Sequence, residues 1–235
     1  MTITRCTITG LDDLALVPQV NALFRHFPFL EIGILFSANN AGQDRRFPSI
    51  ENIQTMIETL DGNIALHICG RSVEDVITDN QASAANLLAR HPNVGRIQLN
   101  LNARAKWLPS PEIIDNAIND LGKPVIIQEN AANHELNRRL TAPNHQLLFD
   151  SSGGLGKAAD VWPAIIPGKS CGFAGGLGPD TITQEIPRIE AVAGLNEIWI
   201  DMEGRVRTDE NWLDLEKVRV VLGVVADHSR ERAAR

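Results

Sequence analysis

Two glycine clusters, each directly after a short apolar run, predict chemistry more clearly than any other part of this sequence. Residues 146–149 (QLLF) lead to Asp150 and then to GGLG at 153–156, and residues 171–174 (CGFA) lead to GGLG at 175–178. An apolar run followed by glycines and a polar residue or proline is typical of a buried parallel strand that passes into a helix. Glycines let backbone N–H groups approach a ligand closely, and consecutive N–H groups at such a turn bind anions. We therefore expect two adjacent anion-binding loops, with the carboxyl group of Asp150 beside the first.

Strand and helix patterns alternate along the chain and predict the scaffold that positions these loops. Each of eight apolar strand candidates is followed by a segment with helical periodicity. The expected strands are residues 3–9, 29–37, 64–69, 95–100, 124–128, 146–149, 171–174 and 197–201. The expected helices are residues 11–27, 49–60, 72–90, 110–121, 131–140, 158–166, 179–193 and 213–226. Eight β-then-α units predict one α/β domain over residues 1–235, a (β/α)8 TIM barrel, with an open doubly wound sheet as the alternative.

Polar and apolar residues alternate within six of the expected strands. Because alternate residues of a barrel strand point inward, one set should face the surrounding helices and the other the barrel interior. The inward set is polar toward the C-terminal ends of the strands, where enzymes of this fold have their active sites. Half-exposed strands also alternate, so the functional interpretation depends on the repetition in six strands. The polar positions are Glu31, His67, Gln98, Asn100, Gln128, Asn130, Asp150 and Asp201.

Composition limits the partners and the compartment that we expect. The net charge of −7 disfavours nucleic acid and anionic membrane surfaces as main partners. Three cysteines without CxxC spacing are typical of a reduced cytosolic protein. The sequence starts without the apolar run of a signal peptide, and no stretch approaches the ~20 apolar residues of a membrane span. We expect a cytoplasmic protein that binds a small anionic substrate; monomers and dimers both suit such a barrel, and we favour a homodimer.

The glycine motifs resemble those of phosphoribosylanthranilate isomerase, a family of ribulose-phosphate-binding barrels. FDSSGGLGK at 149–157 and AGGLGP at 174–179 are similar to the family pattern LLDS…GGTGK…W followed by LAGGLxPxNV, and Trp162 falls at the family's tryptophan. RFPS at 46–49 is similar to part of the family's FxxSPRYVS, and Asp201 followed by LDLEK is similar to its strand-eight Asp followed by KD. The resemblance extends over the whole chain, but its specific motifs are confined to strands six and seven.

The resemblance implies a reaction and a set of roles. Asp150 matches the general acid that protonates the furanose ring oxygen, Arg46 matches the arginine that holds the substrate carboxylate, and Asp201 matches the strand-eight acid. The implied reaction is an Amadori rearrangement, in which an acid opens the ring and a base removes the C2 proton, and it requires no cofactor. The residues that match the phosphate-facing loops are Gly154, Gly156, Gly175 and Gly176.

The first strand departs from the family pattern at the catalytic base. The family begins with KICG, whose cysteine is the base, whereas Thr9 stands at that position here. A threonine hydroxyl is a weak base unless a neighbour activates it. Cys6, three residues earlier, faces the opposite side of the strand. HICG at 67–70 resembles KICG but lies on the third strand, where Cys69 shares the inward face with His67.

The segment after strand eight also departs from the family. The family has DVSSGVE there, whereas this chain has DMEGRVR at 201–207. Glu203 would repel a phosphate, while Arg205 and Arg207 would attract one. These changes favour an altered substrate.

Three functions therefore stay open. The first is an aldose–ketose type isomerase with Asp150 as the acid and the base among Glu31, His67, Cys69 and Asp201. The second is a metal-dependent epimerase or lyase that uses Glu31, His67, Asp150 and Asp201, although no close pair such as HxH supports it and we expect no metal. The third is a non-catalytic ligand-binding barrel, which the loss of the family's cysteine at Thr9 favours.

Overall fold

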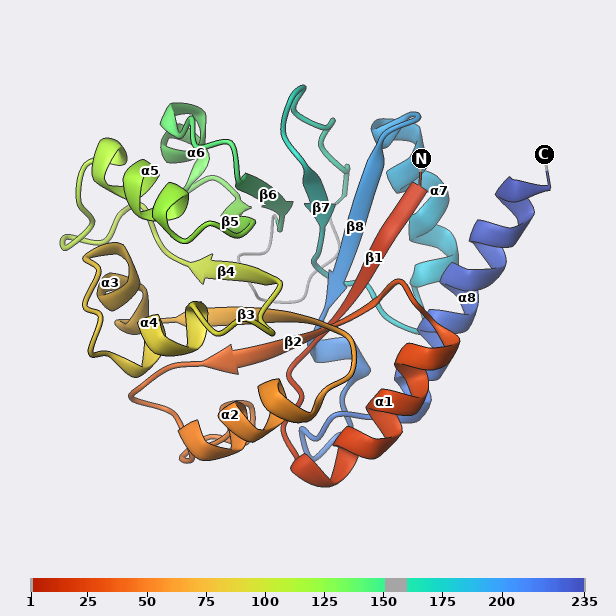
Figure 1. Cartoon of the computed structure of the whole chain (residues 1–235). Helices are drawn as coiled ribbons and strands as arrows, with labels where there is room; N and C mark the ends of the chain where they lie inside the picture. Colours follow the sequence, from red (N-terminus) through yellow and green to blue (C-terminus); the bar gives the residue numbers. More distant parts are fainter. Residues whose placement is uncertain (1, 151–159, 235) are drawn as a thin grey trace.

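Eight parallel strands close into a barrel in the computed structural model, which describes residues 2–150 and 160–234. The strands follow one another around the barrel in chain order, and the helices lie outside them (Figure 1). The strands are β1 (Thr2–Thr9), β2 (Leu30–Phe36), β3 (Asn63–Cys69), β4 (Arg96–Asn100), β5 (Val125–Glu129), β6 (His145–Phe149), β7 (Cys171–Phe173) and β8 (Glu197–Met202). The predicted (β/α)8 barrel is confirmed, and both ends of every strand lie within one residue of the expected position.

The helices pack outside the barrel, and most lie where the sequence predicted them. They are α1 (Val17–His26), α2 (Ile50–Thr59), α3 (Ser72–Ile77), α4 (Ala84–Ala89), α5 (Pro111–Asp120), α6 (His134–Arg139), α7 (Ile182–Ala193) and α8 (Leu215–Ala233), with short 3-10 turns η1 (Leu14–Leu16) and η2 (Gly204–Val206). None of the helices in the described part of the chain combines the length and the apolar character that crossing a bilayer requires.

Two helix predictions were wrong in detail. The helix expected over residues 72–90 is divided into α3 and α4, because Asp79 adopts a positive φ of 53° and Ser83 starts a new helix by accepting a hydrogen bond from the backbone of Asn86. The described part of the helix expected at 158–166, residues 160–166, is not helical. Pro163 lies inside that segment and restricts the backbone there.

The strands bury apolar side chains on their outer face and a mixed set on their inner face. The outward residues of β2, for example Ile32 and Phe36, belong to the large core between strands and helices. A separate small apolar cluster fills part of the interior and consists of Ile126, Leu148, Ala174 and Trp199. The polar inner residues therefore need hydrogen-bond partners of their own, since a buried polar group without a partner is costly.

Arg96 on β4 and Glu31 on β2 form a buried ion pair inside the barrel, below the C-terminal ends of the strands. This pair provides partners for the charged groups in that part of the interior. The Arg96 Nε donates to Glu31 Oε2 at 2.9 Å, and a second guanidinium nitrogen contacts Oε1. The Thr7 hydroxyl donates to Glu31 Oε1 at 2.9 Å, and the guanidinium carbon lies 4.6 Å from the ring centroid of Trp199. The side chains of Arg96 and Glu31 are 5% and 1% exposed. The predicted division between outward apolar and inward polar residues is thus present, and the charges of Arg96 and Glu31 are paired.

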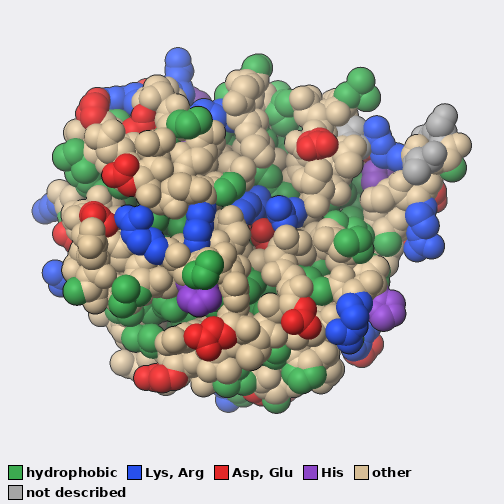
Figure 2. Space-filling view, in the orientation of Figure 1, with side chains coloured by type: hydrophobic (Ala, Val, Ile, Leu, Met, Phe, Trp, Pro, Cys, Tyr) green, Lys and Arg blue, Asp and Glu red, His purple; other side chains and the backbone are tan. Residues whose placement is uncertain are grey.

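The surface charge is mixed on the face that Figure 2 shows. Lys and Arg side chains form a row across the middle of this face, and Asp and Glu side chains lie around the row. Charges of both signs therefore occur together on this face.

The Arg96–Glu31 pair makes a testable contribution to stability. Arg96→Met should lower the free energy of unfolding by about 3–5 kcal/mol, because the Glu31 carboxylate then stays buried without its buried partner and keeps Arg5, whose Nε lies 3.9 Å from Oε2. Urea unfolding measures this change. Arg71→Met is the control, because the Arg71 side chain is 82% exposed, and it should change stability by less than about 0.5 kcal/mol.

The double variant Arg96→Met/Glu31→Leu should recover most of the lost stability, since neither charge is then buried alone. A loss below about 1 kcal/mol in Arg96→Met would contradict this account of the interior.

Candidate active site

A cavity of about 680 Å³ opens at the C-terminal ends of the strands. Most of the polar residues that the sequence placed in a functional mouth line this cavity. They are Thr9, Arg46, His67, Gln98, Asn100, Gln128, Asn130, Asp150, Gly175, Gly176, Asp201 and Arg205. Glu31 does not line the cavity, because it lies one layer deeper against Arg96. Gly154 and Gly156 lie outside the described residues.

Thr9 and Asp201 meet at one side of the cavity, where β1 lies beside β8. The Thr9 hydroxyl donates to Asp201 Oδ1 at 2.8 Å. Gly33 on the neighbouring strand β2 leaves room for this hydroxyl, because a Cβ at that position would lie 2.4 Å from Thr9 Oγ1. The residue at the position of the family's cysteine therefore orients a carboxyl group in this chain.

Burial raises the pKa of Asp201 to about 7. The hydrogen bond from Thr9 opposes this shift, and the negative charges of Glu203 and Glu31 add to it. A carboxyl group whose pKa lies near neutrality can both take up and release a proton under physiological conditions. Asp201 thus has the property that a general base or acid needs.

Asp150 lies at the end of β6 and contributes a second carboxyl group to the cavity. Its side chain is buried, and Gln128 Nε2 on β5 donates to its Oδ2 at 3.2 Å. Gln128 is therefore placed to orient the carboxyl group of Asp150. The mouth holds two buried acids whose surroundings differ, an arrangement that suits paired proton transfers.

The other base candidates are less suited to proton transfer. Burial, together with the charge of Arg96, lowers the pKa of His67 to about 3, so its imidazole is neutral. Burial raises the pKa of Cys69 to about 11, and its thiol accepts a hydrogen bond from Asn100 Nδ2 at 3.1 Å. The carboxylate of Glu31 is held by Arg96. Asp201 is thus the base candidate whose protonation changes near neutral pH.

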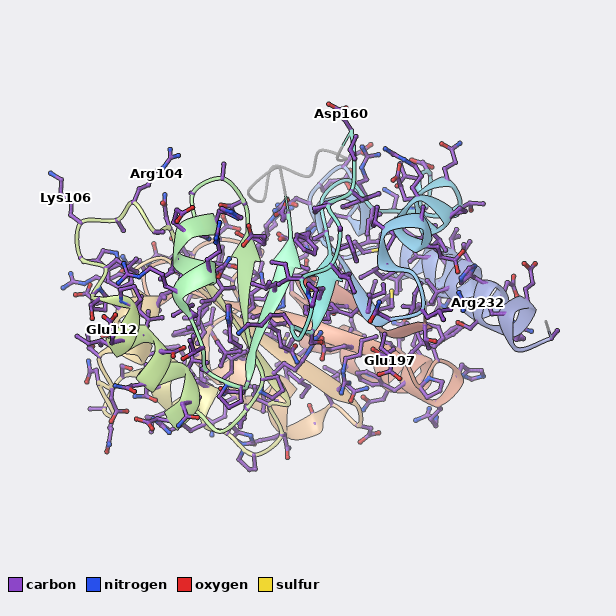
Figure 3. The ribbon with its side chains drawn as sticks, turned by 90° about the horizontal axis from the view of Figure 1, so that it is seen from above. Arg104, Lys106, Glu112, Asp160, Glu197 and Arg232 are labelled. Atoms are coloured by element: carbon purple, nitrogen blue, oxygen red, sulfur yellow. The ribbon has the colours of Figure 1, made fainter. Side chains whose placement is uncertain are left out.

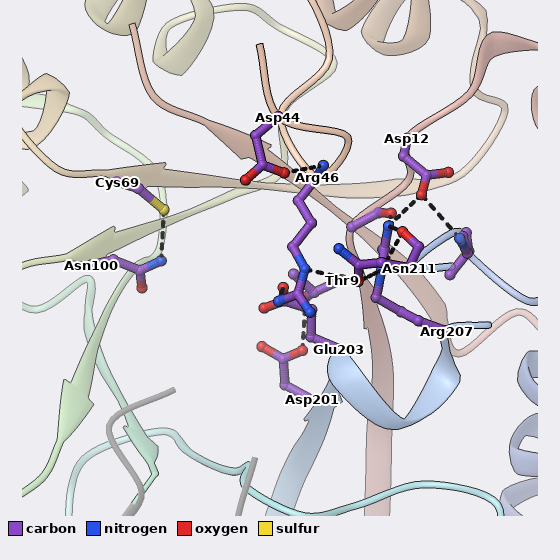
Figure 4. A network of polar contacts seen from close by, with 12 residues as sticks. Thr9, Asp12, Asp44, Arg46, Cys69, Asn100, Asp201, Glu203, Arg207 and Asn211 are labelled. Carbon is purple, nitrogen blue, oxygen red and sulfur yellow. Dashed lines mark hydrogen bonds and ion pairs between the residues drawn. The ribbon is translucent and has the colours of Figure 1, made fainter. Parts of the chain in front are cut away.

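Arg46 is fixed at the rim of the mouth by residues that come from the loop after β8 (Figure 4). Its Nη1 donates to Glu203 Oε1 at 2.7 Å, and its Nε donates to Asn211 Oδ1 at 3.1 Å. Asn211 Oδ1 also accepts from Arg207 Nε at 2.9 Å. Burial raises the pKa of Glu203, an effect that the charge of Arg46 opposes. The charge of Arg46 is therefore balanced within the chain.

Arg207 is a structural residue rather than an anion ligand. It is 3% exposed, it forms a buried ion pair with Asp12, and its Nη1 donates to the carbonyl of Gly10 at 2.8 Å. The sequence had suggested that Arg207 attracts a phosphate. The structure instead uses it to join the loops after β1 and β8.

The loop after β7 offers the backbone of two glycines to the cavity. Gly175 and Gly176 have φ values of 96° and 70°, a region that favours glycine. The Thr181 hydroxyl donates to the carbonyl of Gly176 at 2.8 Å and ties the loop to the start of α7. Arg205 packs close by, since a Cβ on Gly178 would lie 2.4 Å from its Cβ. This side of the mouth combines glycine backbone that lines the cavity with the positive charge of Arg205.

Several residues of the site were missed by sequence reasoning. Asn102, Arg104 and Asn133 line the cavity from the loops after β4 and β5. Arg104 and Lys106 extend outward from the loop after β4, on the side of the molecule where Asp160 also lies (Figure 3). Asn102 and Arg104 come from a segment without periodicity, and Asn133 lay inside the helix expected at 131–140, so no pattern marked the three as lining residues.

The stability of an Asp201→Asn variant should depend on pH in a defined way. The pKa of Asp201 is higher in the folded protein than the ordinary value near 3.8, so the folded state binds more protons between these two values. The stabilisation that comes from the preferential protonation of Asp201 in the folded state is complete below about pH 4, and it is lost as the pH rises through about 7. The free energy of unfolding of Asp201→Asn minus that of the wild type should thus increase by up to about 4 kcal/mol between pH 4 and pH 8.

Urea unfolding at several pH values measures this difference. Asp209→Asn is the control, because Asp209 is exposed on a loop, and its difference from the wild type should stay constant with pH. A constant difference for Asp201→Asn as well would contradict the raised pKa.

This chain is similar in fold to solved structures, and it matches no protein-family model. No curated protein matches it either. Among solved structures, a phosphoribosylanthranilate isomerase from Thermotoga maritima is similar with a TM-score of 0.59 and 15% identity, covering 96% of this chain and 99% of that chain. The enzyme of the same name from Thermus thermophilus has a TM-score of 0.59 and 18% identity, covering 95% and 98%. A truncated 3-deoxy-D-arabino-heptulosonate 7-phosphate synthase from Thermotoga maritima has a TM-score of 0.58 and 10% identity, covering 99% and 87%. At such low identity, what this chain shares with these enzymes is the TIM-barrel fold.

Proposed function

We propose that this protein is an acid–base isomerase, related in mechanism to phosphoribosylanthranilate isomerase, that acts on a small anionic substrate in the mouth of the barrel. The observation that carries the proposal is the buried Asp201 carboxyl group, which is held by Thr9 and has a pKa of about 7. It opens onto the same cavity as Asp150. The motif resemblance and the shared fold support the same reaction class.

The two acids can divide the proton transfers of an aldose–ketose isomerisation. Asp150 donates a proton to the ring oxygen of the substrate, the bond between C1 and that oxygen breaks, and the remaining heteroatom on C1 forms a double bond to C1. Asp201, in its ionised form, removes the proton from C2, and the electron pair of that C–H bond moves toward C1. Asp201 then returns its proton to C1, and the C2 hydroxyl group gives up its proton, through solvent, to Asp150. C2 thereby becomes the carbonyl carbon, both carboxyl groups regain their first state, and the reaction needs no oxidant or reductant.

The opposite side of the mouth suits the anionic end of the substrate. Gly175 and Gly176 present backbone there, and Arg205 adds a positive charge. Arg46 contributes less net charge, because Glu203 is paired with it at 2.7 Å. We therefore place the anionic group near the loop after β7 rather than at Arg46.

The two other functions have weaker support. A metal site would need several ligands close together, and no group of three or more His, Cys, Asp or Glu side chains within residues 2–150 and 160–234 could hold a metal ion. A binding module without catalysis would not need Thr9 and Gly33 to shape the surroundings of Asp201.

Exchange of the C2 proton with solvent tests the proposal without knowledge of the physiological substrate. The protein is incubated in D₂O with phosphoribosylanthranilate or with aldopentose 5-phosphates, and deuterium at C2 is followed by NMR. The wild type should catalyse exchange with at least one of them. Asp201→Asn should slow it at least ~100-fold, because the base is lost, with KM within about threefold.

The rate should rise as pH increases through about 7, because the ionised form of Asp201 is the active one. Asp150→Asn should abolish isomerisation of cyclic substrates, and Asp209→Asn should match the wild type. Absence of exchange with every substrate, or unchanged exchange in Asp201→Asn, would refute the proposal.

A further inference from the structure

We infer that the substrate is a polyhydroxylated, non-aromatic anion such as an aldose phosphate, and that His67 and Gln98 bind its hydroxyl groups. This inference rests on the proposed function only for the place of the substrate in the mouth. It names a substrate class that differs from the aryl-bearing phosphoribosylanthranilate.

The wall of the cavity formed by the ends of β4 and β5 and their loops is rich in uncharged hydrogen-bonding groups. These side chains are Gln98, Asn100, Asn102, Gln128, Asn130 and Asn133. None of the lining residues within 2–150 and 160–234 is Phe, Tyr or Trp, and the sequence of residues 151–159 contains none of these either. An aryl group would therefore find no Phe, Tyr or Trp ring to stack against.

Two buried polar atoms, one on this wall and one on the adjacent strand β3, have no hydrogen-bond partner among the described residues. They are His67 Nε2 and Gln98 Oε1, whose side chains belong to neighbouring strands and are paired across β3 and β4. His67 and Gln98 are 2% and 3% exposed, and both line the cavity. Buried polar groups normally have partners, so the missing partner points to a ligand.

The neighbouring amides determine what Gln98 can bind. Asn100 donates its Nδ2 to the Cys69 sulfur, so its Oδ1 accepts the Nε2 of Gln98 at 2.7 Å. The atom of the Gln98 amide that has no partner is Oε1, which is a hydrogen-bond acceptor. An anionic oxygen would be repelled there, and an apolar group would leave the acceptor unpaired. A hydroxyl group supplies the missing donor.

The neutral imidazole of His67 fits the same ligand. Because it carries no charge, one ring nitrogen donates a hydrogen bond and the other accepts one. A hydroxyl group can also do both, so it can pair with either tautomer. Adjacent hydroxyl groups of a sugar could thus reach His67 and Gln98 together, while the phosphate lies near Gly175 and Gly176.

Calorimetric titration of the wild-type protein with D-ribose 5-phosphate and with phenyl phosphate tests the inference. The two ligands share a phosphate and differ in carrying hydroxyl groups or an aromatic ring. Ribose 5-phosphate should bind at least tenfold more tightly. This comparison requires no substitution, so it does not depend on the folding of a variant.

A Gln98→Met variant then tests the role of the acceptor. Methionine has a similar length but cannot accept the hydroxyl proton well, so the affinity for ribose 5-phosphate should fall at least tenfold. The affinities for phenyl phosphate and for inorganic phosphate should stay within twofold of the wild type, which also shows that the variant is folded.

Three outcomes would overturn the inference: equal affinity of the wild type for the two ligands, an unchanged preference in Gln98→Met, or no binding of ribose 5-phosphate at millimolar concentration. The proposed function fails on a different result, namely C2 exchange that is absent or that survives in Asp201→Asn.

Discussion

The buried ion pair of Arg96 and Glu31 is the interaction on which the polar interior depends. It lies one layer below the mouth and satisfies charges that a barrel interior cannot leave unpaired. The pair also acts on the groups above it. The charge of Arg96 helps to lower the pKa of His67, whereas at Asp201 the charge of Glu31 raises the pKa and the charge of Arg96 lowers it. The pair therefore supports the barrel and favours the neutral imidazole of His67, while the raised pKa of Asp201 comes first from burial.

The mouth above this pair is divided by chemistry. Two acids, Asp201 and Asp150, line it, neutral amide side chains lie on the β4 and β5 side, and the glycine backbone of the loop after β7 borders it. Thr9 holds Asp201 in place, because its hydroxyl donates a hydrogen bond to the Asp201 carboxyl group. Gly33 leaves the space that this hydroxyl occupies. Our proposal assigns the base to Asp201 on the neighbouring strand β8, and Thr9 is the residue that donates a hydrogen bond to it.

The barrel could be predicted from the sequence because strand periodicity and glycine loops are local signals. The inward direction of His67, Gln98 and Asp150 followed from alternation alone, and the structure has them lining one cavity. The roles of Arg207 and Glu203 could not be predicted, because their partners Asp12 and Arg46 lie more than 150 residues away in the sequence. The helix expected after β6 was wrong over residues 160–166, where Trp162 turns toward α7 and its Nε1 donates to Glu185 at 2.7 Å.

The measurement that tests the central claim most directly is the pKa of the Asp201 carboxyl group. Carbon-13 NMR of the protein with labelled aspartate, titrated with pH, gives this value, and the Asp201→Asn spectrum identifies the signal. The account predicts a pKa near 7, which would make Asp201 a proton carrier at neutral pH. A value in the ordinary range near 3.9 would contradict it, because Asp201 would then be a permanently ionised structural group.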